Sequence, residues 1–596
     1  MVAASILQAH CPTEVQNTML RTAFALLFVS AMSLTAQTSA ASAAQNNTAT
    51  PTAAAAPTVT AAPAEVAIQV DLAKPQGPYK PIGRWFGYDE SDYTFMQYGK
   101  QLLGELHDMS PVPVYIRAHH LLTSGDGVPS LKWSSSNVFT LDANGKPVYD
   151  FTILDKIFDA YHDAGVRPFV ELGFMPKDLA SGDGPYMLPY PKTVTGSVQS
   201  PPKDYAMWGE LVRRFTEHLV QRYGKAEVAT WYFEVWNEPD IGYWKGTPAE
   251  YYKLYDYSVA GIRKALPNAM VGGPAVTGPG STRATTFLND FFKHCEHDKN
   301  AWTGEPIPLD FVTFHPKGQA RFVDGHVRMG LSNELSAAAS GFRTVAASTK
   351  YHDLPIILSE ADPEGCAACS AKENAANGYR NGLMYPAYTA VAMKALTDLA
   401  AQSKVNLAGM LNWAFEFEGK QYFEGFRTLA TNGIDKPELN VFRMAGMFSG
   451  DRVETTSSAQ IASGTIARAG VREQPDIDAF ASKSLREAAV MLWNYHDDDL
   501  PAADTKVTVK IAGIPAGVHR VRLEHFRIDD NHSNAFTVWK AMGSPQEPTP
   551  EQYAQLKAAG QLQLLTSPEW LDVSGGSVTV ATQMPRQAIS LLHLEW

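Results

Sequence analysis

The chain has 596 residues, of which 45% are hydrophobic and 19% charged, so a large core is available and wholesale disorder is excluded. Fifty Lys and Arg residues against 62 Asp and Glu residues give a net charge of −12, which disfavours binding to nucleic acid or to an anionic membrane surface. At roughly 150 residues per domain, with α/β barrels reaching about 250, the length predicts two or three folded domains.

The N-terminus carries the pattern of a targeting signal. Arg21–Leu34 combine a positive residue, a short apolar run and small residues, and Ala41–Ala43 would suit a signal peptidase. The run is shorter than the about 20 residues of a membrane span, and no later stretch predicts one. Residues 1–44 are therefore predicted to be a signal peptide, with Met19 as an alternative start, and the protein to be exported to the periplasm or the exterior. Residues 45–65, rich in Ala, Thr and Pro, are expected to form a disordered linker.

Four cysteines in a chain this long do not make a disulfide scaffold. Cys366 and Cys369 form an isolated C-x-x-C, for which a local disulfide or free thiols are favoured over a metal site, because structural zinc wants four ligands. No metal site is predicted.

Eight short apolar runs, most of them followed by a stretch with helical spacing, occupy the middle of the chain. Such runs are typical of strands buried on both faces of a parallel sheet. Eight strand–helix units predict a (β/α)8 TIM barrel, an α/β fold, over residues 81–447 rather than a doubly wound sheet, which would want a G-x-G-x-x-G motif. The runs are Ile82–Gly87, Val114–Ile116, Arg167–Leu172, Thr230–Val235, Met270–Gly273, Phe311–Phe314, Ile356–Ser359 and Met410–Trp413.

After about residue 450 the pattern changes to alternating or apolar segments separated by Gly, Pro and Asp. This pattern predicts a C-terminal antiparallel β-sandwich domain over residues 448–596. Residues 66–80, which include the apolar alternation of Ala67–Leu72, are expected to add a strand to this sandwich. His496–Asp499 falls between two of the segments and is expected to be a solvated turn rather than a cation site.

Polar side chains follow the predicted barrel strands, where the functional residues of such barrels lie. Two carboxylates, two histidines and an arginine at these positions are hard to explain as packing. The candidates are Arg117, His119, Asn237, Glu238, His315, Glu360, Trp413, Glu416 and Glu418.

The strongest local signal is Trp231–Asp240, WYFEVWNEPD. Pro239 ends the strand ladder, so Asn237 and Glu238 stand side by side at the end of a strand. Glu360 follows another apolar strand three predicted units later. Two carboxyls facing each other across a sugar suit glycoside hydrolysis: a retaining enzyme holds them about 5–5.5 Å apart, one as nucleophile and the other as acid and then base. Their mutual field raises the pKa of one of them.

An ordered set of short motifs extends this signal from Trp85 to the C-terminus. In this order the motifs resemble glycoside hydrolase family 39, one of the retaining barrel glycosidases whose fourth strand ends in Asn-Glu-Pro. The motifs are Tyr115–Arg117, Trp231–Asp240 with Tyr243 and Trp244, Lys253–Asp256, Val271–Pro274, Phe311–Pro316, the strand before Glu360, Asn432–Ile434, Lys436 with Pro437, and Asp529–Ala535.

The resemblance implies roles for the central residues. Glu238 would be the general acid/base, and Glu360 the nucleophile that forms a glycosyl-enzyme. Asn237 would bind the sugar 2-hydroxyl, a contact that tightens in the transition state. Arg117 and His315 would hold the nucleophile carboxylate and keep it ionised; without a ligand role they would be an interior ion pair and a core histidine.

The resemblance also implies the outer contacts, and here the sequence departs from the family. Trp413 would stack on the sugar, and His119, Glu416 and Glu418 would contact its outer hydroxyls. Xylosidases of the family tend to have Thr-Glu-Trp-Asn at the nucleophile, whereas Ser359–Asp362 reads Ser-Glu-Ala-Asp, and the acidic pair after Trp413 is spaced differently.

Together these features predict an exported retaining exo-glycosidase that removes terminal pentose units from plant cell-wall polysaccharides or oligosaccharides, with β-xylosidase as the leading activity. No cofactor is expected, and the oligomeric state stays open. An α-L-arabinofuranosidase-type activity on arabinogalactan side chains is the alternative. Uronic-acid hydrolysis would want further basic residues around the sugar, which the sequence does not place. A catalytically silent carbohydrate-binding protein and a metal-dependent hydrolase are the alternatives from other classes.

Overall fold

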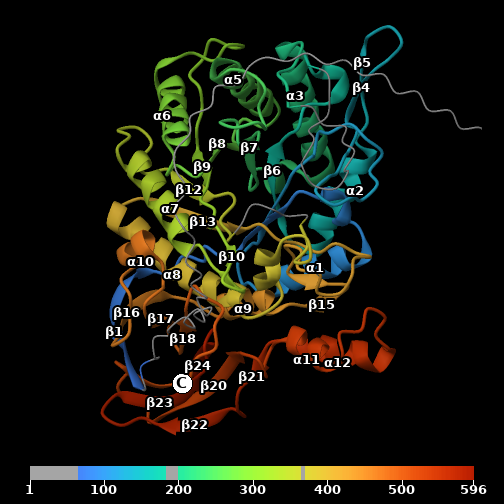
Figure 1. The fold of residues 1–596 in the computed structure, drawn as a ribbon. Coiled ribbons are helices and arrows are strands. Elements are labelled where there is room, and N and C mark those ends of the chain that lie inside the picture. The colour runs from blue at the N-terminus through green and yellow to red at the C-terminus, as the bar shows by residue number, and fades with distance from the viewer. Residues whose placement is uncertain (1–62, 64, 183–198, 364–368) are drawn as a thin grey trace, which may run out of the picture. The chain divides into compact units, whose positions relative to one another are not determined.

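The computed structural model describes residue 63 and residues 65–182, 199–363 and 369–596 (Figure 1). The predicted signal peptide lies outside these residues, as do most of the predicted linker and Cys366. Cys369 is disulfide-bonded and Cys295 is free and buried. No helix in the described ranges combines the length and the apolar character that a membrane span requires.

Eight parallel strands close into a barrel, one strand from each predicted apolar run, which confirms the (β/α)8 prediction. In barrel order the strands are β2 (Trp85–Tyr88), β3 (Tyr115–Ala118), β6 (Arg167–Leu172), β7 (Tyr232–Val235), β8 (Met270–Thr277), β9 (Phe311–His315), β12 (Pro355–Leu358) and β13 (Asn406–Asn412).

Helices connect these strands. Thr247 caps one of them through a reciprocal capping box with Glu250, as its Thr-Pro-x-Glu sequence dictates. The helices are α1 (Gln97–Asp108), α2 (Thr152–Ala164), α3 (Tyr205–Tyr223), α4 (Lys225–Val228), α5 (Pro248–Ala265), α6 (Thr282–His297), α7 (Leu331–Ala346), α8 (Met384–Ser403) and α9 (Pro437–Gly446), with short 3₁₀ turns η1 (Ser91–Tyr93), η2 (Lys177–Leu179) and η3 (Ala375–Arg380). The loops also contain small two-stranded hairpins. These are β4 (Phe139–Leu141)–β5 (Pro147–Tyr149), β10 (Arg321–Val323)–β11 (His326–Arg328) and β14 (Ala430–Thr431)–β15 (Ile434–Asp435).

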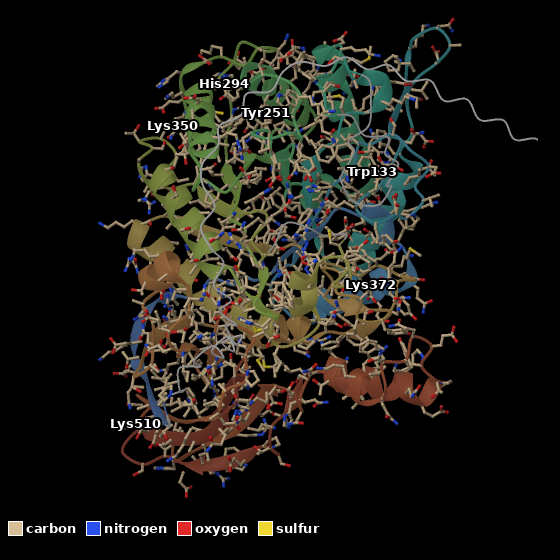
Figure 2. All side chains as sticks on the ribbon, in the orientation of Figure 1. Trp133, Tyr251, His294, Lys350, Lys372 and Lys510 are labelled. Atoms are coloured by element: carbon tan, nitrogen blue, oxygen red, sulfur yellow. The ribbon has the colours of Figure 1, made fainter. Side chains whose placement is uncertain are left out.

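Helix α5 is pinned to the strand that leads to the predicted catalytic segment. Tyr251, labelled in Figure 2, is fully buried, and its hydroxyl donates to the carbonyl oxygen of Val235 at 3.0 Å. This bond satisfies the last carbonyl of β7 just before the chain turns towards Asn237 and Glu238.

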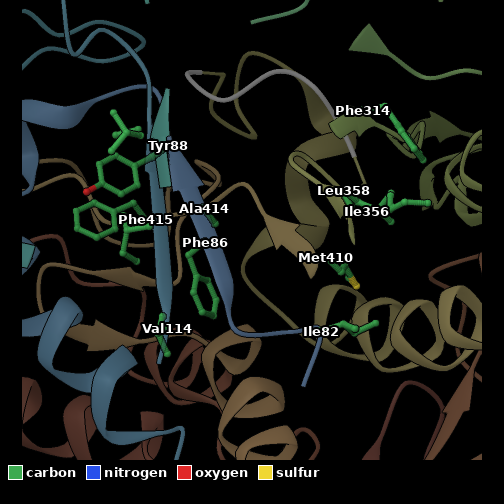
Figure 3. Packing of buried hydrophobic residues seen from close by; sticks show 14 of the residues in the cluster. Ile82, Phe86, Tyr88, Val114, Phe314, Ile356, Leu358, Met410, Ala414 and Phe415 are labelled. Carbon is green, nitrogen blue, oxygen red and sulfur yellow. The ribbon is translucent and has the colours of Figure 1, made fainter. Parts of the chain in front are cut away.

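The alternation of side chains along the strands divides the barrel core in two. Trp85 and Tyr115 point inward and stack at 4.3 Å in a cluster that fills the barrel interior. Their neighbours Phe86 and Ile116 belong to the larger cluster between strands and helices. Part of this outer cluster is seen in Figure 3, where the Tyr88 and Phe415 rings lie side by side; their centroids are 3.9 Å apart.

The C-terminal region forms a large, mostly antiparallel sheet with a core of its own, as the predicted β-sandwich requires. Its strands are β16 (Asp451–Ser457), β17 (Asp476–Lys483), β18 (Glu487–Tyr495), β19 (Thr505–Ala512), β20 (Arg520–Ile528), β21 (Gln563–Leu564), β22 (Glu569–Asp572), β23 (Ser577–Met584) and β24 (Ile589–Glu595), joined by β1 (Glu65–Pro78) from before the barrel. Helices α10 (Ser463–Ala469), α11 (Ala535–Ala541) and α12 (Pro550–Gly560) lie in its connections. In Figure 1 the red strands lie below the green elements of the barrel.

Strand β1 lies between two strands of this sheet rather than at an edge. It pairs antiparallel with β16 and parallel with β19, so Ile68 faces Ser457 on one side and Val509 on the other. The parallel pair departs from the expected all-antiparallel pattern, because β1 enters from before the barrel and not from a neighbouring hairpin.

The expectation of a solvated turn at His496–Asp499 is wrong. His496, Asp497 and Asp498 are buried. Asp498 accepts from Arg328 Nε at 2.5 Å and faces His326 Nε2 at 3.2 Å, so this turn binds the β10–β11 hairpin. Local polarity predicted exposure, but the partners come from about 170 residues away and were not visible in the local sequence.

Strand β1 should be required for the stability of the sheet. Ile68 is fully buried, and Ile68→Ala should lower the free energy of unfolding by about 2–5 kcal/mol in urea denaturation, because it leaves a cavity. The neighbouring Gln69 is exposed, and Gln69→Ala should change the free energy of unfolding by less than about 0.5 kcal/mol. Equal effects of the two substitutions would contradict a core position for this strand.

Candidate active site

A tight turn after β7 presents Asn237 and Glu238. Trp236 and Glu238 both adopt positive φ, at 70° and 44°, which few side chains tolerate without support. The support comes from neighbouring segments: the Glu238 backbone N–H donates to Ala275 at 2.9 Å, and Asp240 accepts from the Thr277 backbone N–H at 2.9 Å. The turn is therefore fixed to the end of β8.

His315 connects the two predicted catalytic carboxyls. Its Nδ1 lies 3.0 Å from Oε1 of Glu238 and 3.7 Å from Oε1 of Glu360, while its Nε2 lies 3.1 Å from the Ser359 hydroxyl. Inverting glycosidases hold their carboxyls about 6.5–9.5 Å apart and retaining ones about 5–5.5 Å. Two oxygens at these distances from one nitrogen reach even the lower end of the inverting range only if the three atoms lie close to a straight line. The geometry favours a retaining pair.

A layer of charged side chains lies inside the barrel on the inward-facing positions that follow the aromatic layer. Arg117 is fully buried and pairs with Glu171 at 2.9 Å, Glu234 at 2.6 Å and Glu360 at 3.1 Å. Its Nη2 also donates to the amide oxygen of Asn237 at 3.0 Å. Arg117 thus holds Glu360, as predicted, and also anchors two acids and the amide beside Glu238.

The surroundings of Glu360 keep it ionised. Burial by itself would raise the pKa of this carboxyl, but four nitrogen groups outweigh burial and hold it well below the usual range. In order of effect they are Lys317, His315, His119 and Arg117. The nearest is Lys317, whose Nζ lies 2.6 Å from Oε2. A buried carboxylate that stays charged is suited to act as a nucleophile.

His119 lies among three carboxylates. Its Nδ1 bonds Glu171, and its Nε2 lies 3.6 Å from Asp89 and 3.4 Å from Glu360. Burial would lower the pKa of His119, but these carboxylates, Glu171 first, outweigh burial and raise it to about 9. His119 is therefore a cation at neutral pH.

Trp413 lies in the barrel interior next to these charges. Its indole N–H donates to Asp89 at 3.2 Å, and Lys132 donates to the same carboxylate oxygen at 2.7 Å. The His119 ring is 4.4 Å away. With only 1% of Trp413 exposed, a sugar can stack on its ring only after neighbouring side chains move.

The structure places Glu416 and Glu418 apart from this cluster. Glu416 is buried and accepts the Gly433 backbone N–H at 2.6 Å; burial raises its pKa to about 8. Glu418 accepts the Tyr98 backbone N–H at 3.2 Å. Both acids pack against loop and helix backbone rather than among the partners of Glu238 and Glu360. A substrate contact by either stays a prediction.

Several charged residues of the site were missed by sequence reasoning. Glu171 and Glu234 left a signal, because each stands two residues after an inward aromatic, Phe169 and Tyr232, within an apolar strand. Asp89 and Lys317 follow β2 and β9 almost at once and could have been read as strand-end residues. Lys132 and Arg427 come from long loops and left no such signal. Arg427 donates to Asp362 at 2.9 Å, and Lys317 also pairs with Asp362.

Among the described residues, no three His, Cys, Asp or Glu side chains are grouped to hold a metal ion.

Comparison with known proteins agrees with this geometry. Residues 114–570 match the model of glycosyl hydrolases family 39. The chain belongs to this family. The resemblance inferred from the motifs is thereby confirmed, and the protein is a glycoside hydrolase.

The relatives of this chain differ in the sugar they are named for. It is 26% identical over 500 residues to a β-xylosidase of Geobacillus stearothermophilus, covering 81% of this chain and 86% of that protein. It is 23% identical over 567 residues to the α-L-iduronidase of Mus musculus, covering 88% and 80%. The crystal structure of a monomeric β-xylosidase from Caulobacter crescentus has the same fold, with a TM-score of 0.70, 23% identity and coverage of 89% and 99%.

His119 should make stability depend on pH in the alkaline range. A folded-state pKa of about 9, raised from 6.5, means that its stabilising effect is complete below pH 6.5 and is lost as the pH rises through 9. In urea unfolding, the wild type should lose about 3 kcal/mol over this window relative to His119→Gln, which cannot titrate. The exposed His162 serves as control, since His162→Gln should keep the wild-type slope. Equal slopes for wild type and His119→Gln would contradict the charged state.

Proposed function

We propose that this glycoside hydrolase is an exported, retaining exo-glycosidase that removes terminal pentose units, with β-D-xylosides of plant cell-wall fragments as the leading substrate. The observation that carries the mechanism is the environment of Glu360, a carboxylate kept ionised beside a second carboxyl, Glu238, across the shared His315. The similarity to β-xylosidases supports xylose as the sugar that is removed. The targeting pattern of residues 1–44 supports export.

The reaction would proceed by double displacement. Glu360 attacks the anomeric carbon while Glu238 gives its proton to the departing oxygen, so the glycosidic bond breaks as the ester to Glu360 forms. Glu238, now ionised, then takes a proton from water, which attacks the same carbon and releases the sugar and the Glu360 carboxylate. Asn237, whose amide oxygen accepts from Arg117, would bond the 2-hydroxyl in both steps.

An exo mode fits the burial of the site. Only 7% of the Glu360 side chain and 14% of the Glu238 side chain are exposed. Asp89, Lys132 and Trp413 close the interior behind them and are themselves buried. A site this enclosed suits one sugar at the end of a chain better than the middle of a polymer.

A uronic-acid glycoside is the second candidate, and one observation favours it. Lys317 and Arg427 are basic residues that no local pattern in the sequence placed at the site, and both pair with Asp362, two residues after Glu360. A cation beside the sugar would attract a substrate carboxylate. An α-L-iduronidase is also among the relatives.

The sugar should be identified by a panel of aryl glycosides followed by proton NMR: a β-D-xyloside, an α-L-arabinofuranoside and an α-L-iduronide. The proposal expects turnover of the xyloside, with the same anomer as the substrate released first. Preferred turnover of the iduronide or the arabinofuranoside would contradict the assignment of xylose as the sugar but would be compatible with the proposed mechanism. First release of the opposite anomer would contradict the proposed roles of Glu238 and Glu360.

Substitutions of the two glutamates should affect turnover in different ways. Glu360→Gln should lower kcat by at least about 10³-fold on every substrate, because no nucleophile remains. Glu238→Gln should lower kcat by about 10²–10⁴-fold on substrates with poor leaving groups. Activated aryl glycosides, which need little acid assistance, should still be attacked by Glu360. The exposed Glu305 offers a control in Glu305→Gln, which should act like the wild type. Equal losses on both substrate types for Glu238→Gln would contradict its role as acid.

Membership of a glycoside hydrolase family argues against the alternative of a catalytically silent carbohydrate-binding protein. Loss of turnover with EDTA, restored by a divalent cation, would instead mark a metal-dependent hydrolase.

A further inference from the structure

The two acids that the resemblance assigned to the outer hydroxyls of the sugar lie elsewhere. Glu416 accepts from the Gly433 backbone N–H, and Glu418 accepts from the Tyr98 backbone N–H. A site that distinguishes sugars does so through hydrogen bonds to their hydroxyls, because a buried polar group that is left without its partner weakens binding. A selective site therefore needs another polar pair within reach of the sugar.

Asp89 lies close to the proposed nucleophile, across His119. It follows β2 directly, and its Oδ1 is 3.6 Å from His119 Nε2, which is itself 3.4 Å from Oε1 of Glu360. Two distances that end on one nitrogen place these carboxylate oxygens within about 7 Å of each other, the scale on which glycosidases hold two carboxyls around one sugar. A sugar whose anomeric carbon meets Glu360 therefore has the far side of its ring within reach of Asp89.

Lys132 is the partner of this carboxylate. Its Nζ lies 2.7 Å from Oδ2 of Asp89, and both residues are buried. Lys132 comes from the loop after β3 with a positive φ of 60°, and its backbone N–H donates to Oε1 of Glu90 at 2.5 Å. The next residue, Trp133, labelled in Figure 2, packs against His120 with ring centroids 4.2 Å apart. Backbone strain that neighbouring contacts hold in place is found most often at functional sites.

Both members of the pair keep hydrogen-bonding capacity for a ligand. Oδ2 of Asp89 accepts from Lys132 and, at 3.2 Å, from the Trp413 indole N–H. Among the described residues, the nearest ion partner of Oδ1 is His119 at 3.6 Å, which is beyond hydrogen-bond length. Lys132 has three N–H donors, and its bond to Asp89 uses one. Burial by itself would raise the pKa of Asp89, but Lys132, His119 and Arg427 hold it below the usual range, so the acceptor stays ionised.

We propose that Asp89 and Lys132 are the specificity pair of the site and bind two adjacent hydroxyls on the side of the sugar that is remote from its anomeric carbon. In a xylopyranoside these are the 3- and 4-hydroxyls. One hydroxyl donates to Oδ1 of Asp89 and its neighbour accepts from Nζ of Lys132, so the pair takes the place of Glu416 and Glu418. This inference rests on the proposed function, with Glu360 as the nucleophile, and adds which part of the sugar the site recognises.

Deoxygenated substrates test the pair. kcat/KM of the wild type is measured on an aryl β-D-xyloside and on its 3-deoxy and 4-deoxy analogues. If another sugar of the panel turns over instead, the analogues are those that lack its remote hydroxyls. Each missing hydroxyl should lower kcat/KM by about 10- to 100-fold, because its charged partner is left without a hydrogen bond.

Variants assign each hydroxyl to its partner. Asp89→Asn and Lys132→Met should each reduce the ratio of parent to deoxy substrate at least about fivefold for one of the two analogues. Because the ratio compares two substrates on the same variant, a general loss of activity cancels. Asp89→Ala and Lys132→Gln are the second variants, and thermal unfolding checks that each is folded. As controls, Asp126 and Lys146 are exposed in the same connection between β3 and α2, and Asp126→Asn and Lys146→Met should keep the wild-type ratios.

The outcomes separate this inference from the proposed function. No turnover of any sugar in the panel, or full activity of Glu360→Gln, contradicts the proposed function, and the inference falls with it. If Glu360 is required but the wild type turns over parent and deoxy substrates equally well, only the inference is overturned. Discrimination that persists in folded variants of Asp89 and Lys132 overturns it too, because other groups then bind these hydroxyls. Loss of discrimination in these variants alone supports the pair.

Discussion

The site depends on one buried guanidinium. Arg117 lies inside the barrel above the aromatic layer and bonds carboxylates from three other segments, Glu171 on β6, Glu234 on β7 and Glu360 after β12. A buried cation or a buried acid alone would carry a desolvation penalty of several kcal/mol, and together they compensate one another. Because each partner comes from a different strand, Arg117 fixes the strand ends relative to one another and holds Glu360, the proposed nucleophile, at a defined depth.

Around Arg117 the two carboxyls that we propose to be catalytic have different environments. Glu360 lies on the inner side, where its nitrogen neighbours keep it charged. Glu238 is more exposed, lies on a turn held by β8, and contacts the same ring nitrogen of His315 that faces Glu360. An acid and a nucleophile built from the same side chain need such a difference, because one must carry a proton when the other does not.

The C-terminal sheet region contacts the segment that follows β9. Lys317 stands just before the β10–β11 hairpin, and Asp498 of the C-terminal region binds Arg328 of that hairpin. The sheet therefore braces the segment that carries Lys317, in addition to burying its own core. The turn at His496–Asp499, which looked like a solvated loop, is part of this brace.

By itself the sequence determined the eight strands, the later sheet and the two glutamates, because each depends on local order: an apolar run marks a buried strand, and a proline after Asn237-Glu238 ends one. Only the tertiary structure decided the partners of those glutamates. Lys132 and Arg427 reach the site from loops whose paths no local pattern encodes, and Glu416 is turned away by such a loop onto Gly433. Strand periodicity is a property of neighbours in the chain, whereas charge pairing in a barrel joins residues that only closure of the sheet brings together.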